Sequence, residues 1–225
     1  MIHARTPDPG AEGFHVKQLP LAPQELGELH GITPDAVERL EVFVELLIRW
    51  QRRINLVSRA SLADPWRRHV LDSAQLHPHV PVAARTLVDF GSGAGFPGLV
   101  LAILGGPQVH LVESNQRKCA FLSEANRLTE AGAVIHNTRI ESLEFLDADV
   151  VTARACTCLD QLLALARPVL GRQGRCLFLK GRTVDEELTE SRKQWTMKVN
   201  QITSASDSSG AILIVEDISG HHGNR

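Results

Sequence analysis

From residue 85 onwards the sequence alternates between short apolar segments typical of strands and amphipathic segments typical of helices. Strands are predicted over 85–90, 108–114, 133–137, 148–153 and 174–180, with helices between them over 97–104, 115–129 and 159–168. Repeated strand–helix units imply a parallel sheet with helices on both faces. Two more strands are predicted over 197–204 and 211–218, joined by the turn-rich segment SASDSSG. The expected fold class is therefore α/β, with a doubly wound, mostly parallel sheet and an antiparallel C-terminal hairpin.

The first 80 residues lack this alternation and carry helix signals instead. Proline and glycine are frequent in residues 1–23, which indicates a flexible N-terminal arm. Thr33 is a suitable N-cap, and Pro34 suits the first position of a helix whose apolar residues follow at helical spacing. We expect an arm over 1–23, a helical extension over 24–80 and a ligand-binding domain over 81–225. The last two are expected to pack as one compact unit.

The composition is that of an ordinary globular protein. Of the 225 residues, 43% are hydrophobic and 22% are charged, so a large core can form and a disordered chain or a coiled coil is excluded. The formal net charge of −2 gives no overall basic field that would attract nucleic acid. The chain has no tyrosine, which excludes any mechanism that needs one.

The cysteines do not form a recognisable metal-binding pattern. Cys119, Cys156, Cys158 and Cys176 include no CxxC pair, and the isolated CxC lacks the second pair of ligands that zinc needs. We therefore expect free thiols and no bound metal.

The N-terminus has no apolar core like that of a signal peptide, and no apolar run is long enough to span a membrane. A cytoplasmic location without membrane contact is expected.

The most informative segment is VDFGSGAGFPG over 88–98, between a predicted strand and the helix that follows it. In an open α/β sheet, ligands bind beyond the carboxyl ends of the strands, and glycines let a ligand approach the backbone. A dinucleotide-binding GxGxxG would need glycine where Phe96 stands, and no GK[ST] of a P-loop follows. The spacing of Gly91, Gly93 and Gly95 favours a nucleoside without a pyrophosphate.

Glu113 ends the next predicted strand, where an acidic side chain accepts hydrogen bonds from ribose hydroxyls. Together with the glycine turn, it indicates S-adenosyl-L-methionine (AdoMet) as the ligand and S-adenosyl-L-homocysteine as the product. Residues 139–141 and 152–154 follow later strands and are expected at the same sheet edge. The alternative is a purely structural turn, with Glu113 a surface charge and the later residues without a ligand.

Positive charge is unevenly distributed along the chain. Six arginines and a single acid, Asp64, lie between residues 49 and 69, with Trp50 and Trp66 among them. Five basic residues and no acid lie between residues 167 and 182. Cations interleaved with aromatic rings are typical of nucleic-acid binding, so the two stretches favour a local basic face. The alternative is a set of solvated helix ends.

Several motifs resemble the ribosomal small-subunit methyltransferase G family, also called glucose-inhibited division protein B. They are NLVS (55–58), RHVLDS (68–73), VDFGSGAGFPG (88–98), ESNQRKCAFL (113–122), RIE (139–141), ARA (153–155) and LKG (179–181). The resemblance covers roughly residues 34–182, and the RHVLDS run is its most specific part. It implies a class I AdoMet-dependent methyltransferase with a Rossmann-like sheet and an N-terminal helical extension. The implied activity is methylation of N7 of one guanosine in the decoding region of 16S rRNA.

The resemblance also implies roles for the matching residues. Ile140 and Glu141 would flank the adenine of AdoMet, and Arg154 would align the reactants as the catalytic residue. The full set of predicted cofactor-binding residues is Asp89, Gly91, Gly93, Gly95, Phe96, Glu113, Ile140, Glu141 and Arg154. The predicted RNA-binding residues, from the motifs and the basic stretches, are Arg52, Arg53, Asn55, Arg67, Arg68, His69, Lys180 and Arg182. Asp72 also matches a family position expected on the RNA side of the cleft.

The chemistry of guanine N7 agrees with the residues that are missing. N7 has a free lone pair and no proton, so attack on the methyl group needs no general base. The sequence has neither the Pro-Cys nucleophile of cytosine-C5 enzymes nor the Asn/Asp-Pro-Pro-aromatic loop of amino-directed enzymes. The expected partner is 16S rRNA, within the small ribosomal subunit or an assembly intermediate. The sequence departs from the family at Cys156, where an aromatic residue is frequent, and in the arm before residue 24.

Three other functions are alternatives to methylation of rRNA. An AdoMet-dependent enzyme could act on a small molecule or a protein, although the basic stretches disfavour this alternative. A non-catalytic RNA-binding module would not bind AdoMet. A nicotinamide-dependent oxidoreductase is disfavoured by Phe96 in the glycine turn.

Overall fold

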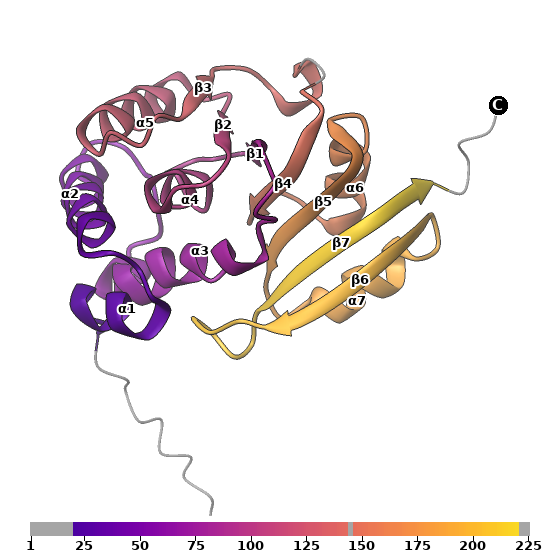
Figure 1. The fold of residues 1–225 in the computed structure, drawn as a ribbon, viewed down its shortest axis with the longest axis horizontal. Helices are drawn as coiled ribbons and strands as arrows, with labels where there is room; N and C mark the ends of the chain where they lie inside the picture. The colour runs from indigo at the N-terminus through magenta and orange to yellow at the C-terminus, as the bar shows by residue number, and fades with distance from the viewer. Residues whose placement is uncertain (1–19, 144–145, 221–225) are drawn as a thin grey trace, which may run out of the picture.

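The computed structural model describes residues 20–143 and 146–220, which form one sheet with helices on both faces (Figure 1). The strands are β1 (Thr86–Phe90), β2 (Gln108–Val112), β3 (Val134–His136), β4 (Ala148–Arg154), β5 (Leu170–Lys180), β6 (Trp195–Thr203) and β7 (Ala211–Gly220). The helices are α1 (Pro23–His30), α2 (Pro34–Gln51), α3 (Asp72–Ala74), α4 (Gly98–Leu104), α5 (Gln116–Leu128), α6 (Leu159–Ala166) and α7 (Val184–Ser191). Shorter helical turns are η1 (Ser61–Ala63), η2 (Trp66–Leu71), η3 (His77–His79) and η4 (Ile140–Ser142).

The strand order of the seven-stranded sheet is β3-β2-β1-β4-β5-β7-β6. Strands β1 to β5 pair in parallel, and β7 pairs antiparallel with both β5 and β6. Phe90 at the end of β1 lies level with Val112 of β2 and Ala153 of β4, so the segments that follow these strands meet at one edge. The predicted fold class, a doubly wound sheet with an antiparallel C-terminal hairpin, is confirmed.

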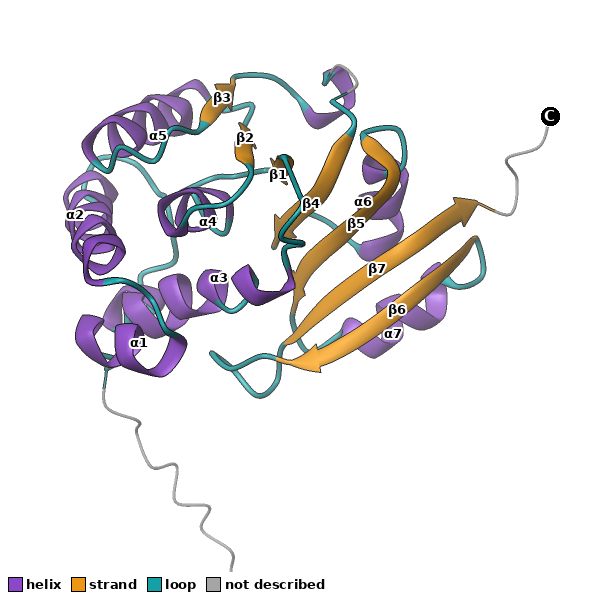
Figure 2. Ribbon diagram, in the orientation of Figure 1, coloured by secondary structure: helices purple, strands orange, loops and turns teal. Residues whose placement is uncertain are grey.

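Two apolar cores lie on the two faces of the sheet, because successive side chains of a strand point to opposite faces. On β1, Leu87 packs into the core that α1 to α5 cover, and Val88 packs into the core that α6 and α7 cover. The two groups of helices are seen on either side of the strands in Figure 2. The N-terminal helices therefore share a core with the sheet.

Helix α2 begins as the sequence predicts. The Thr33 side chain accepts a hydrogen bond from the amide of Ala36 at 3.3 Å, which caps the helix N-terminus. On the buried face, the ring centroid of Phe43 lies 5.0 Å from that of Phe96 in the glycine turn and 6.2 Å from that of Phe121 on α5. Helix α2 thus packs directly against the glycine turn.

The sequence pattern does not predict α1 and α7 as separate helices. Each has only eight residues, and among the side chains whose burial is described the buried apolar ones are few: Leu26 in α1, and Val184 and Leu188 in α7. Strand β5 also begins at Leu170, earlier than the expected residue 174. The predicted arm over 1–23 falls largely outside the described residues.

We expect Phe43→Ala to lower the free energy of unfolding by about 3–5 kcal/mol, because it removes a fully buried ring between α2, the glycine turn and α5. Urea unfolding measures the loss. The control is Ile48→Ala on the same helix, where the side chain is exposed, and it should change stability by about 0.5 kcal/mol or less. Equal losses in the two variants would contradict the packing described for Phe43.

Candidate active site

The glycine turn joins β1 to α4 at the carboxyl edge of the sheet. Gly91, Gly93 and Gly95 have φ angles of +62°, +57° and +88°, a backbone conformation that favours glycine. Space is limited as well, since a Cβ on Gly95 would lie 2.9 Å from the Cβ of Leu99. The shape of the turn itself therefore requires these three residues.

Glu113 follows β2, and its carboxylate is fixed against the glycine turn. Its Oε2 accepts a hydrogen bond from the amide of Gly93 at 3.0 Å, and its Oε1 accepts one from the amide of Asn115 at 2.7 Å. Each carboxylate oxygen has two lone pairs and can accept a further bond. Glu113 thus connects the turn to the start of α5 and keeps acceptor capacity for hydroxyl groups.

Asp89 precedes the turn and is completely buried. Its Oδ1 accepts a hydrogen bond from the hydroxyl of Thr152 on β4 at 2.7 Å, whereas its Oδ2 has no hydrogen-bond partner among the described residues. Burial raises the pKa of Asp89 to about 6, although the hydrogen bond from Thr152 acts in the opposite direction. A buried carboxyl group therefore lies next to the glycine turn, where the Gly98 amide also lowers its pKa.

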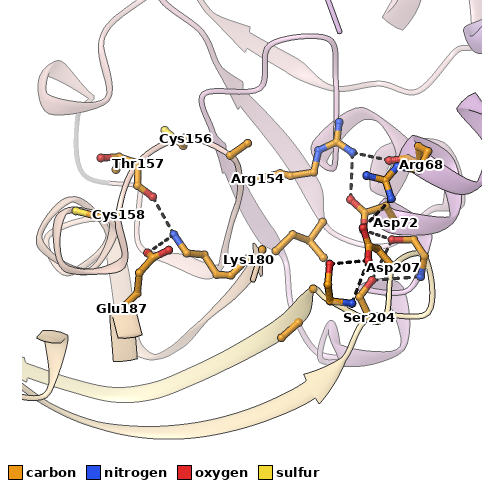
Figure 3. Close-up of a pocket in the computed structure, with 17 residues that line it drawn as sticks. Arg68, Asp72, Arg154, Cys156, Thr157, Cys158, Lys180, Glu187, Ser204 and Asp207 are labelled. Carbon is orange, nitrogen blue, oxygen red and sulfur yellow. Dashed lines mark hydrogen bonds and ion pairs between the residues drawn. The ribbon is translucent and has the colours of Figure 1, made fainter. Parts of the chain in front are cut away.

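Arg154, the last residue of β4, connects three elements through its guanidinium group (Figure 3). One nitrogen lies 3.1 Å from Oδ2 of Asp72 and also donates a hydrogen bond to the carbonyl of Arg68 at 3.2 Å. The guanidinium carbon lies 4.9 Å from the ring centroid of Phe96. Burial lowers the pKa of Arg154, and the charge of Asp72 opposes that shift. Arg154 thus lies between the glycine turn and the RHVLDS segment.

His69 packs on the same aromatic ring as Arg154. Its ring is stacked on Phe96 with a centroid distance of 4.9 Å, and its Nε2 lies 2.9 Å from the hydroxyl of Ser61. Burial, followed by the charges of Arg154 and Arg68, lowers the pKa of His69 to about 3. This residue is therefore a buried, neutral imidazole with only 6% of its surface exposed.

A cavity of about 510 Å³ opens beside Arg154, with Cys156, Lys180 and Glu187 on one side of Figure 3 and Arg68, Asp72 and Asp207 on the other. The turn between β6 and β7 forms one wall. Because β7 runs antiparallel to β5, this turn returns to the edge where the parallel strands end. The C-terminal hairpin therefore completes the cavity.

The hairpin turn is fixed to the RHVLDS segment by side-chain contacts. Asp72 accepts a hydrogen bond from the hydroxyl of Ser206, and Arg68 pairs with Asp207 at 2.8 Å. Gln75 donates to the hydroxyl of Ser204 at 3.0 Å and accepts from the Ala205 amide at 2.8 Å. These contacts hold together segments that are more than a hundred residues apart in the sequence.

The remaining predicted RNA-binding residues lie in several places. Lys180 lies in the cavity, where it is paired with Glu187. Asn55 and Arg182 are exposed, and Arg67 is half-buried beside Asp64 at 3.2 Å. Arg52 and Arg53 are exposed and line a separate groove of about 430 Å³, together with Leu46, Arg49, Trp50 and Glu124. Positive side chains thus border both the cavity and the end of α2.

Ile140 and Glu141 lie in η4, which follows β3. Ile140 is half-buried and Glu141 is exposed, and both line a cavity of about 370 Å³ with residues of α6 and the segment after it. This hollow is distinct from the cavity beside Arg154.

Sequence reasoning missed several residues of the main cavity: Glu187, Ser204, Ser206, Asp207 and Ser209. The SASDSSG segment was interpreted only as a turn, although its polar side chains were a signal that it might line a site. Glu187 lies on α7, which the sequence did not reveal.

Within the described residues, no group of three or more His, Cys, Asp or Glu side chains is arranged to hold a metal ion. No described helix has the length and apolar character needed to cross a membrane.

Comparison with solved structures supports the fold. A SAM-dependent O-methyltransferase from Thermotoga maritima superposes with a TM-score of 0.53 at 13% identity, over 77% of this chain and 71% of that one. A SAM dependent methyltransferase from Aquifex aeolicus also gives 0.53 at 13% identity, over 70% of this chain and 95% of the other. At this identity the likeness concerns the fold alone.

Sequence comparison is more specific. The family described as rRNA small subunit methyltransferase G matches residues 36–212. Ribosomal RNA small subunit methyltransferase G of Paramagnetospirillum magneticum is 51% identical over 199 residues, which are 88% of this chain and 97% of the relative. The protein of the same name from Rhodospirillum rubrum is 54% identical over 187 residues, 83% of this chain and 93% of the relative. The chain therefore belongs to the rRNA small subunit methyltransferase G family, as its motifs predicted.

Proposed function

We propose that this protein transfers the methyl group of AdoMet to N7 of a specific guanosine in the decoding region of 16S rRNA. Membership of the family supports an rRNA methyltransferase that uses AdoMet. The observation that carries the proposal is the position of Arg154, which contacts Phe96 of the glycine turn and Asp72 of the cavity wall at the same time. A cofactor at the turn and a base in the cavity would both be next to this side chain.

The residues around the glycine turn suit AdoMet. Glu113 offers acceptor capacity for ribose hydroxyls, and the lack of a side chain on Gly93, where an added Cβ would meet only the Gly91 carbonyl oxygen at 3.5 Å, lets a ligand approach the backbone. The buried carboxylate of Asp89 adds negative charge next to the turn, which suits a cationic ligand. Ile140 and Glu141 complete the proposed set at the adenine. When bound, AdoMet supplies a methyl group on a sulfonium that leaves as a neutral thioether.

The side chains of the cavity suit a reaction without a general base. N7 attacks with its own lone pair, so the protein has to orient the base and exclude water. Arg154 is held by Asp72 and the carbonyl of Arg68, which fixes its position before any substrate binds. His69 is buried, contacts Ser61 and is stacked on Phe96, so it supports the ring, and N7 has no proton for it to remove. Electrostatic preorganisation of this kind is effective where water is excluded.

The basic surface suits an RNA partner. Arg52 and Arg53 lie beside Trp50 in an open groove, and Arg68 lies at the cavity with its side chain 48% exposed. Asn55, Arg67 and Arg182 extend this set, and all are proposed to contact RNA. Contacts to phosphates supply affinity that depends on salt and not on sequence. We propose that the protein binds this RNA within the small ribosomal subunit or an assembly intermediate. We therefore also propose that the protein acts in the cytoplasm.

The proposal is tested by methylation of small subunits that lack N7-methylguanosine. Purified protein and AdoMet should introduce this nucleoside at one position of 16S rRNA, located by nuclease digestion and mass spectrometry. Since Asp89, with a pKa of about 6, is ionised and His69 is neutral above about pH 7, the single-turnover rate constant should be constant between about pH 7 and pH 8.5. A methyl group on another atom, or a rate constant that rises tenfold per pH unit, would contradict the proposal.

We expect Arg154→Ala to lower kcat roughly 100-fold, because an alignment contact next to the reacting atoms is lost. The Kd for AdoMet, measured by calorimetry, should change less than threefold, or about 0.6 kcal/mol. Arg85→Ala is the control, since Arg85 is exposed and precedes β1, at the edge of the sheet opposite to the glycine turn. Equal losses in kcat and in AdoMet affinity, or a loss in neither, would exclude Arg154 from the active centre.

We expect Arg52→Ala/Arg53→Ala to weaken RNA binding and to lower the slope of log Kd against log salt by about 1.4, as for two lost phosphate contacts. Filter binding over a salt series measures the slope. The charge-matched control is Arg192→Ala/Lys193→Ala, which removes two cations at the end of α7. If both double variants have the same slope, the groove at the end of α2 is not part of the RNA interface.

A further inference from the structure

The cavity beside Arg154 has an unusual lining for a site that holds a nucleobase. Among the described residues that line it, none is aromatic, so stacking on a ring of the cavity wall does not select a base there. Instead, three pairs of a cation and a carboxylate line it: Arg154 with Asp72, Arg68 with Asp207, and Lys180 with Glu187. Hydrogen bonding to the edge of the base is the remaining means of recognition.

In the pair of Lys180 and Glu187, the lysine is predicted to bind RNA, and its ammonium group is held by two close contacts. Lys180 is only 8% exposed in its side chain, and its Nζ lies 2.6 Å from Oε2 of Glu187 and 2.9 Å from the carbonyl of Thr157 (Figure 3). An ammonium group has three N–H donors, and these two contacts leave one. The pair thus presents a free donor on the side of the cavity opposite to Asp72.

Glu187 keeps acceptor capacity next to that donor. Its Oε2 receives both Lys180 and the amide of Leu159 at 2.8 Å, whereas its Oε1 receives only the hydroxyl of Thr183 at 3.0 Å among the described residues. Burial alone would raise the pKa of Glu187, but the hydrogen bonds from Lys180 and Leu159 lower it below its ordinary value. The group is therefore an ionised carboxylate, which only accepts hydrogen bonds.

A donor beside an acceptor matches guanine and not adenine. The Watson–Crick edge of guanine carries the O6 acceptor, followed by the N1–H and N2–H donors. Adenine reverses this order, because its amino group donates at the first position and its N1 accepts at the second. We propose that Lys180 and Glu187 read the Watson–Crick edge of the target guanine, with Lys180 donating to O6 and the remaining lone pair on Oε1 of Glu187 accepting from the 2-amino group.

This arrangement also suits the site of methylation. N7 lies on a different edge of the purine from N1 and the 2-amino group. N7 is on the Hoogsteen edge next to O6, so a base read by Lys180 and Glu187 keeps N7 free of these contacts, in a cavity that Arg154 also lines (Figure 3). The proposal rests on the proposed function, since it names the residues that select the base for that reaction.

The test uses small subunits that carry inosine in place of the target guanosine. Inosine keeps N7, O6 and N1–H and lacks only the 2-amino group. The wild-type protein should methylate inosine with a kcat/KM between about 10-fold and about 100-fold lower than guanosine, as for a lost hydrogen bond to a charged group. The Kd for AdoMet and the thermal melting curve of each variant are measured together with these kcat/KM values.

Glu187→Gln should bring the ratio of the two kcat/KM values close to one. The amide oxygen of the new side chain would take the place of Oε2, since Leu159 and Lys180 both donate there, and its NH2 group would face the 2-amino group of guanine. Lys180→Met should instead lower kcat/KM for guanosine and inosine by the same factor, because both bases have O6. The ratio is taken on one enzyme preparation, so a fraction of misfolded protein does not affect it.

The matched control is Glu190→Gln on the same helix, where the glutamate is paired with Lys193 and is 63% exposed. It should keep the wild-type ratio. A wild-type ratio in Glu187→Gln, or a wild-type protein that does not distinguish the two bases, would overturn the assignment of Glu187. Absence of N7 methylation of guanosine by the wild type is a separate result, which would overturn the proposed function and the base-reading role with it.

Discussion

The ion pair between Arg154 and Asp72 is the interaction on which the geometry of the site depends. Each side chain is 17% exposed, so both charges are largely removed from water. Such a pair offsets the cost of desolvation only if further hydrogen bonds satisfy the remaining groups. Arg154 also donates to the carbonyl of Arg68, and Asp72 also accepts from Ser206 and Gln75. The pair is thus the centre of a network and is not an isolated contact.

That network explains why the C-terminal hairpin belongs to the site. In a purely parallel sheet, the segment after β6 would leave the carboxyl edge through another helix, as α7 does after β5. Here β7 runs back along β5, so residues 204–210 return to the same edge and contact the RHVLDS segment. The antiparallel hairpin is therefore a wall of the cavity as well as the edge of the sheet. The helical extension contributes on the other side through Phe43, which supports Phe96 beneath Arg154.

The parts of the site that local patterns encode were predictable from the sequence. The glycine turn and Glu113 each follow a strand, and the parallel arrangement brings the ends of β1 and β2 to one edge. Ser206 and Asp207 were not predictable, because their partners Asp72 and Arg68 lie 134 and 139 residues away. Glu187 was missed since α7 has too few buried apolar residues to show a helical period. His69 illustrates a further limit: the motif identified the residue, but only the packing on Phe96 shows that its ring is buried.

Recognition of the substrate divides into two parts under these proposals. Exposed arginines around α2 and at the cavity mouth would hold the RNA backbone, and the polar cavity would select one base and present its N7. The most direct measurement is mass spectrometry of 16S rRNA from a strain that lacks the gene for this protein. If the proposed function is correct, the decoding-region fragment loses N7-methylguanosine and is lighter by one methyl group, and the gene supplied in trans restores it. Unchanged N7-methylguanosine in that fragment would contradict it.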